Sequence, residues 1–103
     1  MSLAFAGGSH RTVPIELREK LAFSSEHATE ALARFQKQFP GSEAVLLSTC
    51  NRIELYAADE ERRGPPPPDE LAMFLAECRG IDPTNAGRVL GGEQGTAAVK
   101  HLF

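Results

Sequence analysis

The chain has 103 residues, the length of a single globular domain, and 42% hydrophobic and 24% charged residues exclude a disordered or collagen-like chain. Eleven Lys and Arg against fourteen Asp and Glu give a formal net charge of −3, which argues against a large basic surface for nucleic acid. No stretch reaches the ~20 apolar residues of a membrane span, and residues 3–8 lack the basic segment of a signal peptide. We therefore expect a cytoplasmic protein with no membrane partner.

The first elements are a strand and two helices. The apolar run at residues 3–6, followed by two glycines, predicts a short buried strand. Pro14 suits the first turn of a short helix. Ser24 or Ser25 can cap a longer amphipathic helix, whose apolar residues recur with a period of 3.6 until Pro40.

The middle of the chain predicts a β-hairpin. Residues 44–47 form a continuous apolar run, and residues 48–51 form a short polar link. From residue 52 the pattern alternates strictly: positions 53, 55 and 57 are apolar, whereas Arg52, Glu54 and Tyr56 lie on the other face. This alternation is typical of a half-buried strand.

The remaining elements follow a proline-rich segment. Residues 59–68 are charged and then contain four prolines, so they predict a solvated loop, too short to separate two domains. Asp69 is the expected N-cap of a second amphipathic helix that ends at Gly80. Residues 88–90 predict a short last strand, and residues 94–103 predict the start of a further helix.

The order strand, helix, strand, strand, helix, strand is the split βαβ pattern. We predict an α+β, ferredoxin-like sandwich, with a four-stranded antiparallel sheet and helices on one face, in one domain over residues 1–103. The alternative for the first and last strands is a buried helical segment, because short apolar runs fit both.

The segment 48–52 is the densest cluster of reactive and polar groups. A free thiol is mostly protonated at neutral pH, so a nucleophilic Cys50 needs a nearby cation or hydrogen-bond donors, and Arg52 is two residues away. The alternative is that Cys50 is a small buried hydrophobic residue. Cys78 completes the apolar stripe of the second helix, which indicates a core position. In a reduced cytosol we expect two separate thiols.

The three histidines give weaker signals. His10 follows the first strand, where functional side chains gather, whereas His27 fits the solvated face of a helix. His101 fits a helix surface or a half-buried position. No pair of them has the spacing of metal ligands, so neither a metal site nor a catalytic triad is predicted.

Three segments together resemble one enzyme family. The run at residues 48–56, STCNRIELY, resembles the STCNRxElY signature of glutamyl-tRNA reductase, the NADPH-dependent enzyme that begins five-carbon tetrapyrrole synthesis. Residues 8–24 are similar to the family's GxNHkTAPvelREklafs opening, with Ser9 and Val13 in place of the usual Asn and Ala. Residues 97–103 resemble the stretch that precedes the family's glycine-rich segment. The resemblance covers residues 3–103.

This resemblance implies a catalytic role for Cys50. The family's thiolate attacks the ester that joins glutamate to tRNA, and hydride from NADPH reduces the resulting thioester to glutamate-1-semialdehyde. Thr49 and Arg52 match residues that hold the glutamyl group, and a guanidinium suits a carboxylate. His101 matches a histidine near the nucleophile and is expected to be catalytic, either as the proton donor to the leaving ribose oxygen or as a residue that orients the substrate. His10, Asn51 and Glu54 match motif positions and are expected to support the shape of the site.

The resemblance also implies partners outside this chain. Family members continue with an NADPH-binding domain and a helical dimerisation domain, and no GxGxxG fingerprint occurs here, so we expect this fragment to bind no cofactor. The implied substrate is glutamyl-tRNA, the implied assembly a homodimer, and the implied receiver of the product glutamate-1-semialdehyde aminomutase. Two alternatives stay open: a non-enzymatic ferredoxin-like module that binds a protein through its open sheet face, and a small RNA-binding domain, which the net charge disfavours.

Overall fold

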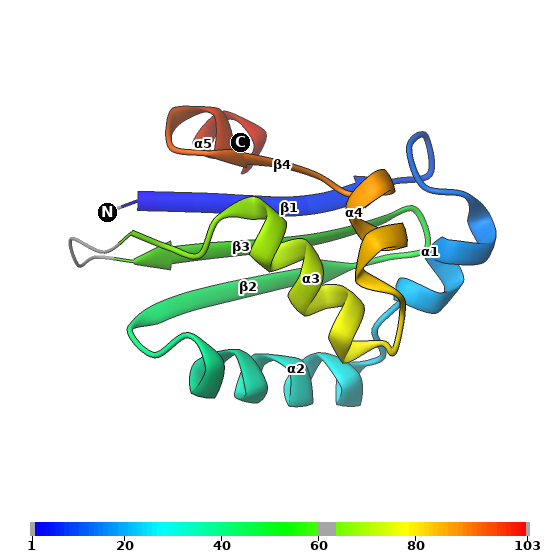
Figure 1. Ribbon diagram of the computed structural model, residues 1–103, viewed down its shortest axis with the longest axis horizontal. Coiled ribbons are helices and arrows are strands. Elements are labelled where there is room, and N and C mark those ends of the chain that lie inside the picture. Colours follow the sequence, from blue (N-terminus) through cyan, green and yellow to red (C-terminus); the bar gives the residue numbers. More distant parts are fainter. Residues whose placement is uncertain (1, 60–63, 103) are drawn as a thin grey trace.

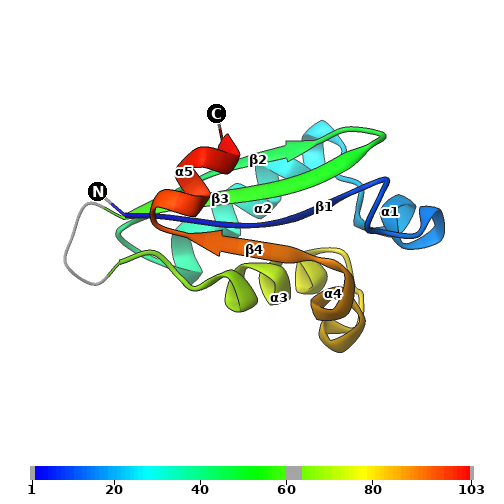
Figure 2. The ribbon, with the colours of Figure 1, turned by 90° about the horizontal axis from the view of Figure 1, so that it is seen from above.

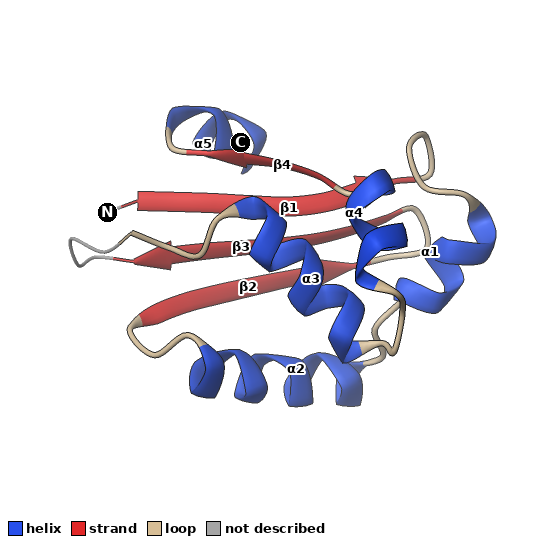
Figure 3. Ribbon diagram, in the orientation of Figure 1, coloured by secondary structure: helices blue, strands red, loops and turns tan. Residues whose placement is uncertain are grey.

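The computed structural model describes residues 2–59 and 64–102. Its strands run side by side with the helices packed around them (Figures 1 and 3). In chain order the elements are β1 (Ser2–Ser9), α1 (Ile15–Leu21), α2 (Ser25–Gln38), β2 (Ser42–Ser48), β3 (Arg52–Asp59), α3 (Pro68–Cys78), α4 (Pro83–Val89), β4 (Gly91–Gln94) and α5 (Thr96–Leu102).

The sheet has the strand order β2-β3-β1-β4, and every neighbouring pair is antiparallel. This is the order of the split βαβ fold, so the predicted ferredoxin-like sandwich is confirmed. Ser9 at the end of β1 pairs with Arg52 at the start of β3. The turn between β2 and β3 therefore lies at the same end of the sheet as the loop that follows β1.

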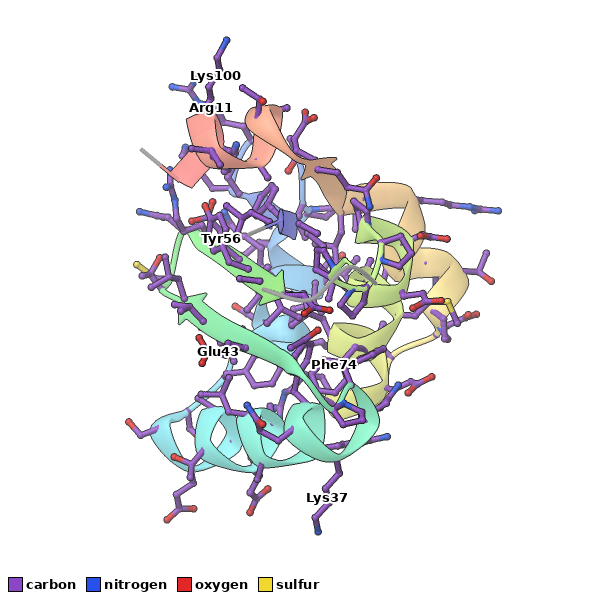
Figure 4. All side chains as sticks on the ribbon, turned by 90° about the vertical axis from the view of Figure 1, so that its left-hand side faces the viewer. Arg11, Lys37, Glu43, Tyr56, Phe74 and Lys100 are labelled. Atoms are coloured by element: carbon purple, nitrogen blue, oxygen red, sulfur yellow. The ribbon has the colours of Figure 1, made fainter. Side chains whose placement is uncertain are left out.

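One face of the sheet packs against α2 and α3 (Figures 1 and 2). The predicted 3.6 period of α2 turns Ala31 and Phe35 inward, and both are buried. Phe35 meets Phe74 of α3 edge to face, with ring centroids 5.4 Å apart. Figure 4 shows Phe74 in the space between these two helices. Burial of such rings supplies much of the free energy that holds the layers together.

The opposite face is partly covered by α5. Phe5 of β1, Tyr56 of β3 and Ala98 of α5 form a second buried cluster. The expectation of a half-buried β3 is therefore wrong, because Glu54 and Tyr56 are only 6% and 4% exposed. A single strand's alternation cannot show that a helix from the far end of the chain packs on its second face.

The predicted strand at residues 88–90 is also wrong. Residues 83–89 form α4, which begins with Pro83 after the N-cap Asp82, whose carboxylate accepts a hydrogen bond from the Thr84 amide at 2.9 Å. The last strand starts one residue beyond the predicted one, at Gly91. Its two glycines and two polar residues carry no apolar alternation, so the sequence pattern does not reveal it.

The start of α3 differs from the prediction by two residues. Its N-cap is Pro67, and Asp69 lies inside the first turn, where a carboxylate still favours the positive end of the helix. The segment between β3 and α3 is shorter than the predicted loop at residues 59–68, because Asp59 is the last residue of β3 and Pro68 is the first residue of α3. Part of that predicted loop, residues 60–63, lies outside the described residues. Residues 64–67 have no regular structure.

Candidate active site

The turn between β2 and β3 is built by Thr49. Its amide donates a hydrogen bond to the Arg52 carbonyl at 2.9 Å, which closes the hairpin. Its hydroxyl oxygen accepts from the amides of Asn51 and Arg52, both at 3.2 Å. Cys50 lies at the tip of this turn and is exposed. The sequence pattern of a polar link between strands therefore presents the thiol to solvent on a well-braced backbone.

The loop after β1 supports the same turn. The His10 amide donates a hydrogen bond to the Asn51 carbonyl at 2.7 Å. This loop is itself fixed by Thr12, whose hydroxyl oxygen accepts from the Ser9 amide at 3.1 Å. The side chains of His10 and Asn51 are exposed, and their backbones carry the contact. The loop after β1 and the hairpin turn are therefore joined through the backbones of these two residues.

A pocket of ≈ 530 Å³ opens beside the hairpin on the face that carries α5. Its lining includes Arg52 and Glu54 of β3 and His101 of α5. Further polar groups come from Ser9 at the end of β1, from Thr12 in the loop that follows, and from Arg88 of α4. Basic, acidic and imidazole side chains therefore meet in one concave site, which is the usual setting of a binding or catalytic centre.

Glu54 contacts two of the other ionisable groups of the pocket, Arg52 and His101. Its Oε2 lies 2.9 Å from Nε2 of His101, and its Oε1 lies 3.8 Å from Nη1 of Arg52. The Glu54 side chain is only 8% exposed, whereas those of Arg52 and His101 are 57% and 43% exposed. A buried carboxylate is stabilised by such partners, and here it links two groups that face the open pocket.

Aromatic rings hold the imidazole from one side. The ring of His101 stacks on Phe5, with centroids 4.0 Å apart and planes 25° from parallel. Tyr56 lies next to Phe5 at 5.0 Å. Burial and the neighbouring Glu54 carboxylate raise the pKa of the Tyr56 phenol above its ordinary value. The phenol of Tyr56 therefore stays neutral up to a higher pH than that of an exposed tyrosine.

The two cysteines have different surroundings. Both are free thiols, as predicted. Cys50 is exposed, so the alternative of a buried small residue is wrong for this position. Cys78 is half-buried against the helix-covered core, which agrees with its predicted place, and burial raises the pKa of its thiol.

Within residues 2–59 and 64–102, no helix is both long and apolar enough to cross a membrane. In the same ranges, no three side chains of the His, Cys, Asp or Glu type cluster closely enough to hold a metal ion.

The chain matches a known protein family over most of its length. Residues 6–103 match the family described as "Glutamyl-tRNAGlu reductase, N-terminal domain". The chain belongs to this family. The resemblance that residues 48–56 suggested is thus confirmed over almost the whole length of the sequence.

Relatives of this glutamyl-tRNA reductase domain are much longer than the chain. It is 43% identical over 103 residues to a glutamyl-tRNA reductase of Rubrobacter xylanophilus and 40% identical over 104 residues to that of Syntrophotalea carbinolica. All of the chain is covered in both, but only 23% of each relative. The solved glutamyl-tRNA reductase of Methanopyrus kandleri superposes with a TM-score of 0.62 at 30% identity, covering 97% of this chain and 21% of that one.

The fold brings only some of the predicted site residues together. Arg52, Glu54 and His101 share the pocket, although His101 is 47 residues from Glu54 in the sequence. Cys50 and Thr49 lie in the adjoining turn and do not line the pocket. The remaining predicted residues, His10 and Asn51, brace that turn from outside the pocket.

Sequence reasoning missed several residues of this domain's pocket. Phe5 stacks on His101 but was assigned only to a buried strand. Arg88 was assigned to a strand that does not exist, and Ser9 and Thr12 were noted only as parts of a motif. The available signal was the Gly7-Gly8 pair at the end of β1, since glycines often mark a place where another group must approach the backbone.

Proposed function

We propose that this chain carries the reactive thiol of an NADPH-dependent glutamyl-tRNA reductase in tetrapyrrole biosynthesis. Cys50 attacks the carbonyl carbon of the ester that joins glutamate to the tRNA ribose. A bond forms between Sγ and that carbon, the bond from the carbon to the ribose oxygen breaks, and the thiol proton ends on the departing ribose oxygen. The products are a glutamyl thioester on Cys50 and free tRNA.

One observation carries this proposal: the exposed thiol of Cys50 lies in a braced turn two residues from Arg52, which lines the charged pocket. A fixed backbone holds a nucleophile at a defined distance from a bound substrate, which lowers the entropic part of the barrier. Membership of the glutamyl-tRNA reductase family supports the identity of the substrate.

Arg52 is the group we assign to the glutamyl side chain. Its side chain is 57% exposed, and among the described residues its only ion pair is the long one to Glu54, so most of its donors are open to a ligand. A guanidinium can donate two parallel hydrogen bonds to a carboxylate. Thr49 shapes the turn and, in this proposal, adds its hydroxyl to the same binding site.

His101 is the group we assign to proton transfer. Its imidazole lines the pocket that Arg52 enters, and an imidazole changes protonation near neutral pH more readily than other side chains. In the proposed reaction it accepts the thiol proton and returns it to the ribose oxygen, which speeds departure of the tRNA.

The described residues do not fit the nicotinamide cofactor. Every strand pair is antiparallel, whereas a dinucleotide site requires a parallel βαβ unit with a glycine-rich turn. No hydride transfer is therefore assigned to the described residues of this chain. In the proposal, NADPH binds a part of the longer protein for which this chain has no counterpart, consistent with the 23% coverage of its relatives. NADPH would supply hydride to reduce the thioester.

The wider setting of the reaction is proposed on family membership alone. It comprises a cytoplasmic location, a homodimer formed through other parts of the protein, and transfer of the product to glutamate-1-semialdehyde aminomutase. The alternative of a non-enzymatic binding module is not supported by the comparisons. Its open sheet face is also partly occupied, since α5 covers Phe5 and Tyr56.

The test is covalent trapping of an activated glutamyl ester by the 103-residue chain. We expect mass spectrometry to find one acyl group on the wild type and on Cys78→Ser, and none on Cys50→Ser. The two variants form a matched pair, because each removes one thiol. Circular dichroism checks that both remain folded. Equal labelling of Cys50→Ser and the wild type would overturn the proposal.

A further inference from the structure

We infer that Glu54 is a positioning residue: it holds His101 through Nε2 and leaves Nδ1 as the ring nitrogen that faces the substrate. The inference deepens the proposed function, on which its catalytic part rests. Its structural part concerns two side chains and is independent of the reaction.

The contact between the two side chains is short and shielded. Glu54 Oε2 lies 2.9 Å from His101 Nε2, and the carboxylate is 8% exposed. A hydrogen bond between an ionised carboxylate and an imidazole N–H is stronger than a neutral one, and more so where water is excluded. Because the carboxylate accepts at Nε2, the neutral ring carries its proton there and has a lone pair at Nδ1.

The ring is fixed by a second contact. Phe5 stacks on one face of His101 at 4.0 Å. Stacking restricts tilting of the ring, and the hydrogen bond to Glu54 restricts rotation within its plane. No partner for Nδ1 occurs among residues 2–59 and 64–102, while 43% of the side chain is exposed. Nδ1 is therefore the nitrogen available to a group in the pocket.

Glu54 also contacts Arg52, the residue assigned to binding the glutamyl side chain. Its other oxygen lies 3.8 Å from Arg52, so one buried carboxylate contacts both the group assigned to the glutamyl side chain and the group assigned to the proton. The other charged groups that line the pocket are Arg88 of α4 and Glu93 of β4. Within the described part of the chain, neither forms a hydrogen bond or an ion pair with His101. Glu93 is exposed, so it is a suitable control carboxylate.

The structural part is tested by nitrogen-15 NMR of the histidine rings in the 103-residue chain. At a pH where His101 is neutral, we expect a protonated Nε2 and an unprotonated Nδ1 in the wild type. We expect the signal of the Nε2 proton to be lost by exchange with water in Glu54→Ala and retained in Glu93→Ala. A protonated Nδ1 in the wild type, or an unchanged Nε2 signal in Glu54→Ala, would overturn the inference.

The catalytic part is tested by a double-mutant cycle on the rate of Cys50 acylation at saturating ester. We expect Glu54→Gln to lower this rate about 10- to 100-fold, the range found when a residue that orients a functional histidine is replaced. In a His101→Ala background the same change should have almost no further effect, because Glu54 acts through His101. Equal losses in both backgrounds would show a merely structural role and overturn the inference.

The same NMR experiment identifies the working nitrogen. The nitrogen-15 spectrum of the wild type assigns the proton to Nε2 or to Nδ1, and the nitrogen without the proton is the one that can accept the thiol proton. An unprotonated Nε2 would overturn the assignment of Nδ1. If the wild type is not acylated at all, the proposed function fails, while the NMR experiment still decides whether Glu54 holds His101.

Discussion

Arg52 is a charged residue at the start of β3, and its side chain lines the pocket and is more than half exposed. Among the described residues, the only ion pair of this side chain is with Glu54, at 3.8 Å. An exposed ion pair of this length adds little to stability. The guanidinium is therefore better suited to bind a ligand than to hold the fold together.

Replacement of Arg52 by Lys should weaken binding and leave the fold intact. Lys keeps the charge but loses the planar fork that contacts both oxygens of a carboxylate. We expect the ester concentration for half-maximal acylation of Cys50 to rise roughly tenfold, which corresponds to the ~1.4 kcal/mol typical of one charge-assisted hydrogen bond. Arg34→Lys is the control, because Arg34 pairs with Glu77 elsewhere on the surface. An unchanged concentration dependence would contradict the assignment of Arg52.

Tyr56 allows a direct test of the buried face, since it is the only tyrosine of the chain. Burial and the Glu54 carboxylate raise the pKa of its phenol, so ultraviolet titration of the folded chain should give a midpoint above the ordinary value of about 10. The unfolded chain releases this proton at lower pH than the folded chain. The free energy of unfolding should therefore fall as the pH rises through and beyond about 10.

Two variants check the cause of this shift. Glu54→Gln should lower the titration midpoint, because it removes the neighbouring charge. Tyr56→Phe should remove the part of the pH dependence that comes from the phenol. A midpoint at the ordinary value in the folded chain would mean that α5 does not cover this face in solution.

At the scale of elements, β4 shows how a strand can form without a strand-like sequence. It pairs with β1 from Ala4↔Gln94 to Gly7↔Gly91, and Gly92 lies against Pro68 of α3. A Cβ at position 92 would overlap the Pro68 side chain and come within 2.7 Å of the Phe5 carbonyl oxygen. The close approach of α3 to this strand therefore requires glycine at position 92.

Gly92→Ala and Gly91→Ala are a matched pair of variants that test this close approach of α3 to β4. A Cβ at Gly91 would meet no atom within 4 Å. We expect Gly92→Ala to lower the free energy of unfolding by about 1–3 kcal/mol through overpacking. Gly91→Ala should change it by less than about 1 kcal/mol, as urea denaturation measures. Similar values for the two variants would show that β4 and α3 are not in close contact.

Sequence patterns predicted the elements that bury a regular apolar stripe. They gave the correct type of element for α2 with its N-cap, for the hairpin of β2 and β3, and for the amphipathic helix α3. The short helix α4 was not found, although Asp82 followed by Pro83 is a local start signal for it. The strand β4 was not found, because it depends on pairing with β1, which is distant in sequence. Local periodicity does not record such contacts.

At the scale of the whole molecule, the sheet separates two regions of different character. The face toward α2 and α3 holds the larger apolar core, and the other face carries a small aromatic cluster and the charged pocket. Stability therefore depends mainly on one face, and the proposed chemistry depends on the other. The two can be disturbed separately.

Substitutions at two neighbouring residues of α3 test whether stability depends mainly on the face of the sheet toward α2 and α3. Phe74 is 2% exposed and packs against two other rings, whereas Met73 is 45% exposed. We expect Phe74→Ala to lower the free energy of unfolding by about 3–5 kcal/mol, and Met73→Ala by less than about 1 kcal/mol. Chemical denaturation followed by circular dichroism measures both. A loss at Met73 equal to that at Phe74 would contradict the position of the core.

The candidate site was predictable only in part. The local run at residues 48–52 indicates Cys50 and Arg52, and the family resemblance adds Glu54 and His101. The contact between Glu54 and His101 could not be predicted from spacing, because it forms only when α5 packs on the second face of the sheet. The roles of Cys50, Thr49, Arg52 and His101 in the reaction stay predictions until the trapping and kinetic experiments are done.

The packing of α5 against β1 and β3 also has a consequence for synthesis on the ribosome. Residues 50–54 leave the exit tunnel long before residue 101, so a nascent chain displays its thiol and its carboxylate while the imidazole is still being translated. His101 thus reaches Glu54 only after the last strand has been added to the sheet. A ribosome stalled within α4 would hold a chain with Cys50 present and His101 missing.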